Sequence, residues 1–523
     1  TDKTGTLTMN RMSVVSSGFT CPEELILHGI AVNSTADLSV ADDGSVQAIG
    51  NPTECALLRW IKDEYGADYR EIRSMYDIES IVPFSTETKY MATVCRNKQT
   101  GERFRFVKGA PEYVMAMCVG GALSDDAAKA SSLLTEYQGN AWRTLGFAVE
   151  RMDSDGGLNL AGVVGIADPV RPDVKEAIDT CRKRAGVKVI VVTGDISATA
   201  EHVGAEIGLF DDGETPRSLT GQQFASMTDE QVLEVLPELR ILSRARPEDK
   251  ARLVELLQRR GEVVAVTGDG TNDALALKKA QVGLSMGDGT ARAKEVSDIT
   301  ILDNSFVSIN KAILWGRSLY LNIRRFIYFQ MTINVCACLL VLVGAFLGVD
   351  SPLTVTQMLW VNLIMDTFAA MALASLPPST SVMKEKPRDR RSFIINRDMA
   401  KQIIGVGCTF FIVLICLLYR FERNGWSLHE QSLFFTIFVM LQFWNMFNAR
   451  AFATGESALR IKSCKGFLFI MELIFIGQIL IVTFGGEMFH VTRLRLEDWL
   501  YIIGGTSFVL WIGEGIRWVK KRK

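Results

Sequence analysis

Apolar residues are distributed unevenly along this chain. Up to about residue 310, short apolar runs alternate with polar segments, as in a soluble protein built from helices and strands. Beyond that point the apolar stretches are long, and short charged loops separate them. Buried helices of a large soluble domain could give one such stretch, but a succession of them favours membrane helices. Six are long enough, at about 20 residues, to cross a bilayer: roughly 325–347, 354–376, 400–419, 431–449, 466–485 and 498–516.

The loops between these stretches differ in positive charge. The linker 377–401 is rich in lysine and arginine, and so are the segment after residue 449 and the C-terminal tail. Because basic residues are enriched in cytoplasmic loops, we expect these segments to face the cytosol, on the same side as residues 1–310. The pattern predicts an integral membrane protein in the lipid bilayer, with cytoplasmic soluble domains.

The first apolar stretch belongs to a longer helical pattern. No proline interrupts the sequence from Val307 to Leu347. A helix of that length would measure about 60 Å, roughly twice the thickness of a membrane. We expect it to run from the soluble half into the bilayer and to link the two mechanically.

Polar residues inside the apolar stretches are candidates for an ion site. Asn334 lies in the first stretch, Asn362 and Asp366 in the second, and Gln442 and Asn445 in the fourth. At helical spacing Asn362 and Asp366 share one face, and a carboxylate at membrane depth is costly unless it faces a cavity, an ion or a partner. Oxygen ligands of this kind suit a hard cation such as calcium. For Asn334 or Gln442 alone, a hydrogen bond between helices is the alternative.

In the soluble half, polar motifs follow apolar runs that predict parallel strands. The run 187–192 ends in Thr193-Gly194-Asp195, and the run 263–266 ends in the sequence TGDGTND. Ligands bind at the carboxyl ends of strands in open α/β sheets. The chain has no GxxxxGK[ST] loop, so it is not a P-loop ATPase.

These motifs contain the groups that phosphoryl transfer needs. Asp2 offers a carboxylate nucleophile for an acyl phosphate. Thr193 and the Gly194 amide can hold phosphoryl oxygens, and Lys250 can neutralise developing charge. Oxygen ligands for Mg²⁺ come from Asp269, Asp2 and the Thr4 carbonyl, with support for metal and phosphate from Asn272 and Asp273.

Charge and cysteine content exclude other classes. The formal net charge is −2, so there is no basic field of the kind that binds nucleic acid. The ten cysteines show no CxxC pairing, which indicates neither a zinc site nor a disulfide framework and suits a reducing cytosol. There is no starting Met and the chain opens inside a motif, so we expect an N-terminal part to be missing.

The order of the motifs DKTGTLT, KGAPE, DPVRP, VTGD and TGDGTNDA resembles the P-type ATPases over essentially the whole chain. The resemblance implies an α/β haloacid-dehalogenase-like phosphorylation domain (1–8 and 161–310) with an inserted α+β nucleotide-binding domain (9–160). An all-α transmembrane bundle of six helices (311–523) would follow. Asp2 would accept the γ-phosphate of ATP, with Lys3 among the catalytic residues of its motif.

Thr4 separates this chain from soluble phosphatases of the same fold. Those hydrolases commonly carry a second aspartate two residues after the nucleophile, as a general acid and base. Thr4 occupies that position, so hydrolysis of the aspartyl phosphate should be slow. A long-lived phosphoenzyme is what coupling to a conformational change requires.

The resemblance also implies an ATP site in residues 9–160. Phe84 would stack on adenine, Glu54 and Lys89 would contact the base region, and Lys108 with Gly109 would line the pocket. Three further residues would meet phosphates or ribose as the domains close: Arg143, Asp195 and Arg244.

The membrane residues Asn334, Asn362, Asp366 and Gln442 match calcium pumps, and specifically the plasma-membrane calmodulin-regulated type. Ala337 stands where two-site pumps carry an acidic residue, which implies one calcium ion per cycle, completed by a glutamate on a missing upstream helix. Exchange for protons follows by analogy. The short tail favours a bacterial inner-membrane pump.

Two alternatives remain open. One is a P-type pump for another cation, such as manganese, sodium/potassium or protons. Pumps for sodium/potassium generally need more membrane carboxylates than Asp366 supplies. The other is a haloacid-dehalogenase-type phosphohydrolase on a membrane anchor, although an anchor needs no buried carboxylate. The expected partners are ATP, magnesium, calcium, the bilayer and the missing N-terminal part, without nucleic acid.

Overall fold

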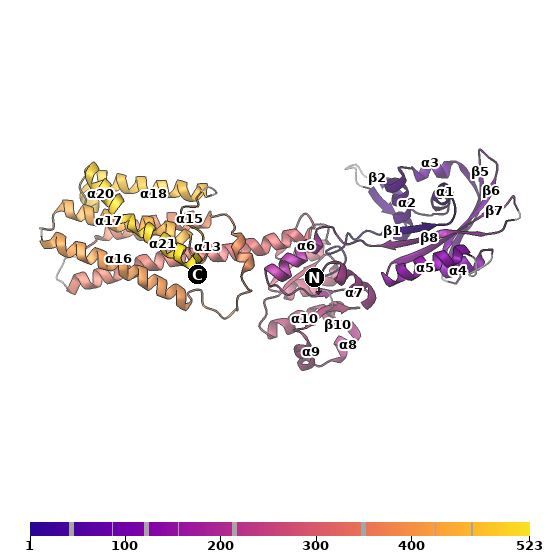
Figure 1. Cartoon of the computed structure of the whole chain (residues 1–523), viewed down its shortest axis with the longest axis horizontal. Coiled ribbons are helices and arrows are strands. Elements are labelled where there is room, and N and C mark those ends of the chain that lie inside the picture. Colours follow the sequence, from indigo (N-terminus) through magenta and orange to yellow (C-terminus); the bar gives the residue numbers. More distant parts are fainter. Residues whose placement is uncertain are drawn as a thin grey trace. The chain divides into compact units, whose positions relative to one another are not determined.

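The computed structural model describes most of the chain, which divides into two compact units. It describes residues 1–40, 46–85, 87–119, 125–154, 156–211, 217–346, 352–423, 425–461 and 464–522. One compact unit consists of Thr1–Lys183 and Val187–Ile309, and the other of Arg184–Gly186 and Asn310–Lys523. Figure 1 labels many of the helices and strands.

A six-stranded antiparallel sheet occupies the first part of the soluble unit. Its order is β1-β8-β7-β6-β5-β4. The strands are β1 (Ser13–Phe19), β4 (Tyr76–Val82), β5 (Tyr90–Asn97), β6 (Arg103–Gly109), β7 (Arg143–Arg151) and β8 (Asn159–Ala167). A separate antiparallel pair is formed by β2 (Asp37–Val40) and β3 (Val46–Ile49).

Helices cover both faces of this sheet (Figure 1). Along β6, Phe104 and Phe106 pack into one core and Val107 into the other, because successive side chains of a strand point to opposite faces. The first core holds α1 (Glu23–Val32), α2 (Pro52–Tyr65) and α3 (Tyr69–Ser74), and the second holds α4 (Pro111–Met117) and α5 (Asp125–Gly139).

The rest of the soluble unit is built on parallel strands. One sheet has the order β10-β11-β9 and another β12-β13-β14. The strands are β9 (Val191–Val192), β10 (Arg217–Thr220), β11 (Leu239–Ser243), β12 (Ala265–Gly268), β13 (Val282–Met286) and β14 (Ile299–Ile301).

The N-terminal residues join these two sheets. Asp2 forms a parallel bridge with Val192, and the Val192 amide donates to the Thr1 carbonyl at 2.9 Å. On the other side the Asp2 amide donates to the Thr267 carbonyl at 3.3 Å. Thr1 and Asp2 therefore lie between β9 and β12, in the middle of the parallel arrangement.

Helices connect these strands, which confirms the α/β class predicted for this part. They are α6 (Val174–Asp179), a π-helical segment (Thr180–Arg184), α7 (Ser197–Glu206), α8 (Gly221–Ser226), α9 (Asp229–Val235), α10 (Pro247–Arg259), a 3₁₀ turn (Thr271–Asp273), α11 (Ala274–Lys279) and α12 (Ala291–Val296).

Three sequence-based boundaries differ from the structure. The predicted strand 187–192 is paired only at Val191–Val192, because the Val187 amide donates to the Cys181 carbonyl at a helix end. The second strand spans Ala265–Gly268 instead of 263–266. The expected domain limit at residue 160 falls inside β8, which pairs with β1 as far as Ala167.

In the part of the chain that the structure describes, six helices are long and apolar enough to cross a membrane, as predicted. The first, α13 (Phe306–Phe346), is continuous over 41 residues, as expected. In the second, α14 (Val355–Leu359) passes through a π-helical turn (Trp360–Met365) into α15 (Asp366–Ala374). The others are α16 (Arg397–Arg423), α17 (Leu428–Arg450), α18 (Lys465–Phe484) and the pair α20 (Leu496–Thr506) and α21 (Phe508–Arg522). A 3₁₀ turn (Thr380–Lys384) and α19 (Gly486–Phe489) lie in connections.

Candidate functional site

Asp2 opens into a cavity at the carboxyl ends of the parallel strands. The cavity has a volume of about 290 Å³. Its lining contains every phosphoryl-transfer residue predicted from the sequence except Lys3: Asp2, Thr4, Thr193, Gly194, Lys250, Asp269, Asn272 and Asp273, together with Asp195, Ala245, Pro247 and Gly270. The structure thus brings together motifs that lie up to about 270 positions apart.

One lysine faces two of the carboxylates in this cavity. Lys250 Nζ lies 3.2 Å from Asp2 Oδ1 and 2.6 Å from Asp273 Oδ1. Burial raises the pKa of Asp2 to about 6; Lys250 opposes this rise and Asp273 adds to it. Burial lowers the pKa of Lys250, but Asp2 and Asp273 more than offset this, so the ammonium is retained at neutral pH.

Three carboxylates in the cavity form an oxygen cluster suited to a hard cation. One oxygen each of Asp2, Asp269 and Asp273 lies within 4.8 Å of the others. Burial, and then Asp273, raises the pKa of Asp269, and Lys250 opposes this rise. Gly5, in the left-handed region at φ 72°, leaves room for Asp269, whose carboxylate a Cβ would overlap. This donor set fits Mg²⁺, and Thr4 also lines the cavity.

The loop that follows Asp2 is held by the motif DPVRP. Asp168 Oδ2 accepts from Thr8 Oγ1 at 2.5 Å. The Arg171 guanidinium donates to the carbonyls of Gly5 and Thr8, at 3.2 and 3.1 Å. Sequence reasoning used this motif only as evidence of family, and missed that Asp168 and Arg171 position the acceptor loop.

Lys3 and Asp195 form an ion pair beside the cavity, with 2.5 Å between Nζ and Oδ2. Asp195 was expected to meet the nucleotide. In the structure its carboxylate is engaged by Lys3, and its amide donates to Thr193 Oγ1 at 3.1 Å. Both residues therefore support the geometry of the phosphoryl-binding loop.

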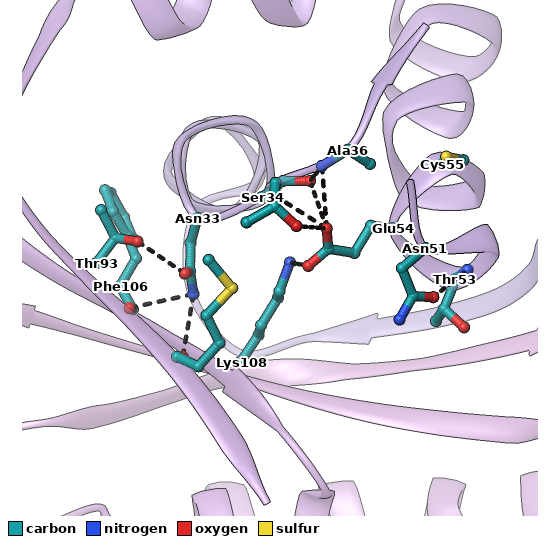
Figure 2. A network of polar contacts seen from close by, with 12 residues as sticks. Asn33, Ser34, Ala36, Asn51, Thr53, Glu54, Cys55, Thr93, Phe106 and Lys108 are labelled. Atoms are coloured by element: carbon teal, nitrogen blue, oxygen red, sulfur yellow. Dashed lines mark hydrogen bonds and ion pairs between the residues drawn. The ribbon is translucent and has the colours of Figure 1, made fainter. Parts of the chain in front are cut away.

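Glu54 and Lys108, two predicted ATP-binding residues, form a buried ion pair (Figure 2). Lys108 Nζ lies 2.5 Å from Glu54 Oε1, while Glu54 Oε2 accepts from the amides of Thr35 and Ala36 at 3.0 and 3.1 Å. Burial acts to raise the pKa of Glu54, but Lys108 and Thr35 outweigh it, so this pKa lies below its usual value of 4.5. The pair couples α2 to β6.

Three of the remaining predicted ATP residues are exposed, namely Phe84, Arg143 and Arg244. Phe84, after β4, is 59% exposed, as a stacking platform would need to be. The Lys89 carbonyl lies against Gly109, where a Cβ would overlap it. Arg143, at the start of β7, and Arg244 are exposed and do not line the cavity around Asp2.

Replacing Lys108 by methionine should destabilise the six-stranded sheet and its helices by about 3 kcal/mol, because it leaves a buried carboxylate without its partner. Thermal unfolding followed by circular dichroism measures this effect. Lys62→Met, at an exposed position of α2, is the matched control. An equal, small shift for both variants would contradict a structural role for the pair.

Three polar side chains are buried without partners in the membrane helices. Asp366 is 4% exposed, and Gln442 and Asn445 are as deeply buried. Among the described residues, no polar side-chain atom of the three has a hydrogen-bond partner, although the Gln330 carboxamide of α13 lies near Asp366. Unpartnered groups in a membrane interior point to a ligand. Sequence reasoning named Asn445 as a candidate but did not place Gln330 in this site.

Asn334 and Asn362 fit the expected site less closely. Asn334 is half-buried on α13, whereas Asn362 is exposed. Residues 360–365 form a π-helical turn, so the shared face predicted for Asn362 and Asp366 is not that of a regular α-helix, and Asn362 is exposed whereas Asp366 is buried. Such a turn holds about one more residue than an α-helical turn and changes the angle between the two side chains.

Three protein-family profiles match the chain. The profile described as "P-type ATPase, cytoplasmic domain N" matches residues 21–173. The profile "haloacid dehalogenase-like hydrolase" matches residues 250–313, and "Cation transporting ATPase, C-terminus" matches residues 350–519.

Known proteins match over nearly the whole chain. Calcium-transporting ATPase PAT1 of Dictyostelium discoideum is 36% identical over 97% of this chain and 51% of its own length. Plasma membrane calcium-transporting ATPase 4 of Homo sapiens is 36% identical over 98% of this chain and 47% of its own length. Calcium-transporting ATPase 12, plasma membrane-type, of Arabidopsis thaliana is 35% identical over 95% of this chain and 52% of its own length. The chain belongs to the P-type ATPase family.

Membership of the P-type ATPase family agrees with both units of the structure. The hydrolase profile covers α10 to the start of α13, including Lys250, Asp269 and Asp273, which confirms the haloacid-dehalogenase-like fold. The C-terminal profile covers five of the six apolar helices described. The chain spans about half the length of the relatives named above.

Proposed function

We propose that the protein containing this chain uses ATP to transport calcium across a membrane, through an aspartyl phosphate on Asp2. The observation that carries the proposal is the environment of Asp2. The Asp2 carboxylate lies 3.2 Å from Lys250 Nζ, inside a cavity that also holds Asp269 and Asp273. The three relatives named above are all calcium-transporting ATPases, which supports calcium as the ion.

The residues of the cavity divide the chemistry of phosphoryl transfer among them. Asp2 presents one carboxylate oxygen to the γ-phosphorus, and the ADP oxygen leaves in line with it. Lys250 neutralises the phosphoryl group, while Thr193 and the Gly194 amide bind its oxygens. Asp2, Asp269 and the Thr4 carbonyl would hold Mg²⁺, which supplies positive charge to the phosphate oxygens. Since Thr4 replaces a second carboxylate, no side chain two residues away can activate water for hydrolysis.

We propose that residues 9–167, inserted between Asp2 and the later strands, bind the nucleotide. Phe84 would stack on adenine, and Lys89 with Gly109 would line the same pocket. Because Glu54 and Lys108 already satisfy each other, we assign them to positioning this pocket. Arg143 and Arg244 are exposed and free to meet phosphates or ribose.

In the membrane unit, we propose that Asp366 and Gln442 bind the transported cation, with Asn334 and Asn362 as further oxygen ligands. Their burial without partners supports this role for Asp366 and Gln442. One carboxylate offers little negative charge, which favours one calcium ion per cycle. The relatives named above are eukaryotic, so the bacterial inner membrane remains a prediction.

The experiment is phosphorylation of the complete protein in membranes by radiolabelled ATP. Calcium should produce an acid-stable, hydroxylamine-sensitive label, because an acyl phosphate is cleaved by hydroxylamine. Manganese at the same free concentration is the comparison. A label that needs manganese and ignores calcium would reassign the ion, and release of phosphate without any stable label would indicate a phosphohydrolase.

A further inference from the structure

The indole of Trp360 packs against α18 and forms a hydrogen bond with it. Trp360 Nε1 donates to Gln478 Oε1 at 3.0 Å, and both side chains are buried. Beside this bond, the ring lies against Gly477, where a Cβ would come within 2.8 Å of Trp360 Cη2. Gln478 therefore supplies the hydrogen-bond acceptor for the indole, and the absence of a side chain at Gly477 leaves room for its ring.

This contact between Trp360 and α18 lies at the start of the π-helical turn that precedes Asp366. Trp360 is the first residue of the turn, and Asp366 follows its last residue directly. The helix before the turn, α14, is also held by hydrogen bonds. Gln357 Nε2 donates to the Phe489 carbonyl and Thr356 Oγ1 donates to the Met488 carbonyl, both at 2.8 Å. Side chains of α14 and the turn are thus fixed to α18 and the segment after it.

Packing alone does not explain why residue 478 is a glutamine, because an apolar residue could fill the same space. Its Nε2 has no hydrogen-bond partner among the described residues, so accepting from the indole is the hydrogen bond that its carboxamide makes. An apolar side chain would fill the same space without leaving the buried NH₂ group of a carboxamide unsatisfied. In an apolar bilayer, helices associate through close packing at small residues and through hydrogen bonds between polar side chains, and Gly477 and Gln478 supply one of each.

We propose that Gln478, with Gly477, is a positioning element for cation binding: it fixes Trp360, and through it the π-helical turn, so that Asp366 stays in its ligand position. π-helical turns are rare and persist where their surroundings hold them. The proposal rests on the function proposed above, with Asp366 as a cation ligand. Gln478 acts through Trp360 and touches no cation itself.

The test compares Gln478→Leu, Trp360→Phe and the double variant in the complete protein, with phosphorylation from ATP measured against free calcium. Leucine removes the acceptor and keeps similar volume, and phenylalanine removes the donor and keeps a ring. Each single variant should raise the half-saturating calcium concentration about three- to tenfold. The maximal phosphorylation and the KM for ATP should stay unchanged, and the double variant should be no worse than the singles because both remove the same bond.

Two controls separate positioning from loss of folding. Gln402→Leu, at an exposed position of α16, should leave the calcium dependence unchanged. Phosphorylation by inorganic phosphate in calcium-free medium reports whether each variant is folded. Gly477→Ala should resemble Gln478→Leu, whereas Gly405→Ala, whose Cβ would meet open space, should not.

The outcomes are distinguishable from failure of the proposed function. Unchanged half-saturation in Gln478→Leu and Trp360→Phe, in a wild-type protein that needs calcium, would overturn this inference alone. Equal losses of maximal phosphorylation from ATP and from inorganic phosphate would also overturn it, because they indicate a merely structural role. A wild-type protein without cation-dependent phosphorylation would overturn the proposed function instead.

Discussion

Asp2→Asn is expected to abolish phosphorylation of the complete protein by ATP and, in magnesium-free buffer, to raise its thermal stability. The label disappears because an amide oxygen does not form a stable acyl phosphate under these conditions. Stability rises because the native state confines three carboxylates near one lysine, and burial raises the pKa of Asp2 from 3.8 to about 6. At neutral pH this shift corresponds to about 2 to 3 kcal/mol against folding, which asparagine removes.

The pH dependence of this stability difference gives an independent check. Since the folded-state pKa is higher than the unfolded value, protonated Asp2 favours the native state, and this contribution is lost as pH rises from about 4 through about 6. The melting temperatures of the variant and the wild type should therefore converge near pH 4, separate as the pH rises to about 6 and stay apart above it. Asp63→Asn, at an exposed position of α2, should show no such separation. Retained labelling in Asp2→Asn would place the phosphate on another residue.

Asp366→Asn should have the second large effect, the loss of cation-dependent phosphorylation by ATP. The carboxylate is buried and its oxygens lack partners among the described residues, so the cation is the charge that it would meet. Losing a buried charged partner costs about 2 kcal/mol or more, equivalent to at least a thirtyfold rise in half-saturating calcium. Phosphorylation by inorganic phosphate, which needs the Asp2 cavity and no transported ion, should persist.

The control for this variant is Asp398→Asn, at the exposed start of α16. It removes the same charge from the membrane unit without touching the buried cluster, so its calcium dependence should match the wild type. Normal calcium transport by Asp366→Asn would show that the ion site lies elsewhere.

The features predicted well from the sequence are those that depend on one-dimensional patterns. Hydropathy alone placed the six apolar helices to within a few residues at most ends, and the absence of proline predicted the continuity of α13. The cavity residues of the motifs TGD and TGDGTND could be found because each of these two motifs directly follows an apolar run. Strand ends in a parallel sheet converge, so Thr193, Asp269 and Asp2 meet wherever the strands pair.

The features that were missed depend on contacts between distant segments. Nothing in the local sequence indicates that Glu54 would be engaged by Lys108, or that Arg171 would bind the carbonyls of the acceptor loop. The limit of β8 at Ala167 follows from its pairing with β1, not from its own composition. The π-helical turn at Trp360–Met365 was also hidden, because its residues suit an α-helix equally well.

The place of Thr1 and Asp2 between β9 and β12 has a consequence for the order of folding. The neighbours of this segment, Val192 and Thr267, lie about 190 and 265 residues later in the chain. At a synthesis rate of roughly 5 to 20 residues per second, Asp2 leaves the ribosome about 15 to 50 s before the second neighbour exists. The six-stranded sheet between them, whose strands lie within residues 13–167, can form during that interval. Such distant pairing makes closure of the parallel sheet a slow, late event, so the phosphate acceptor is synthesised early and reaches its final position late.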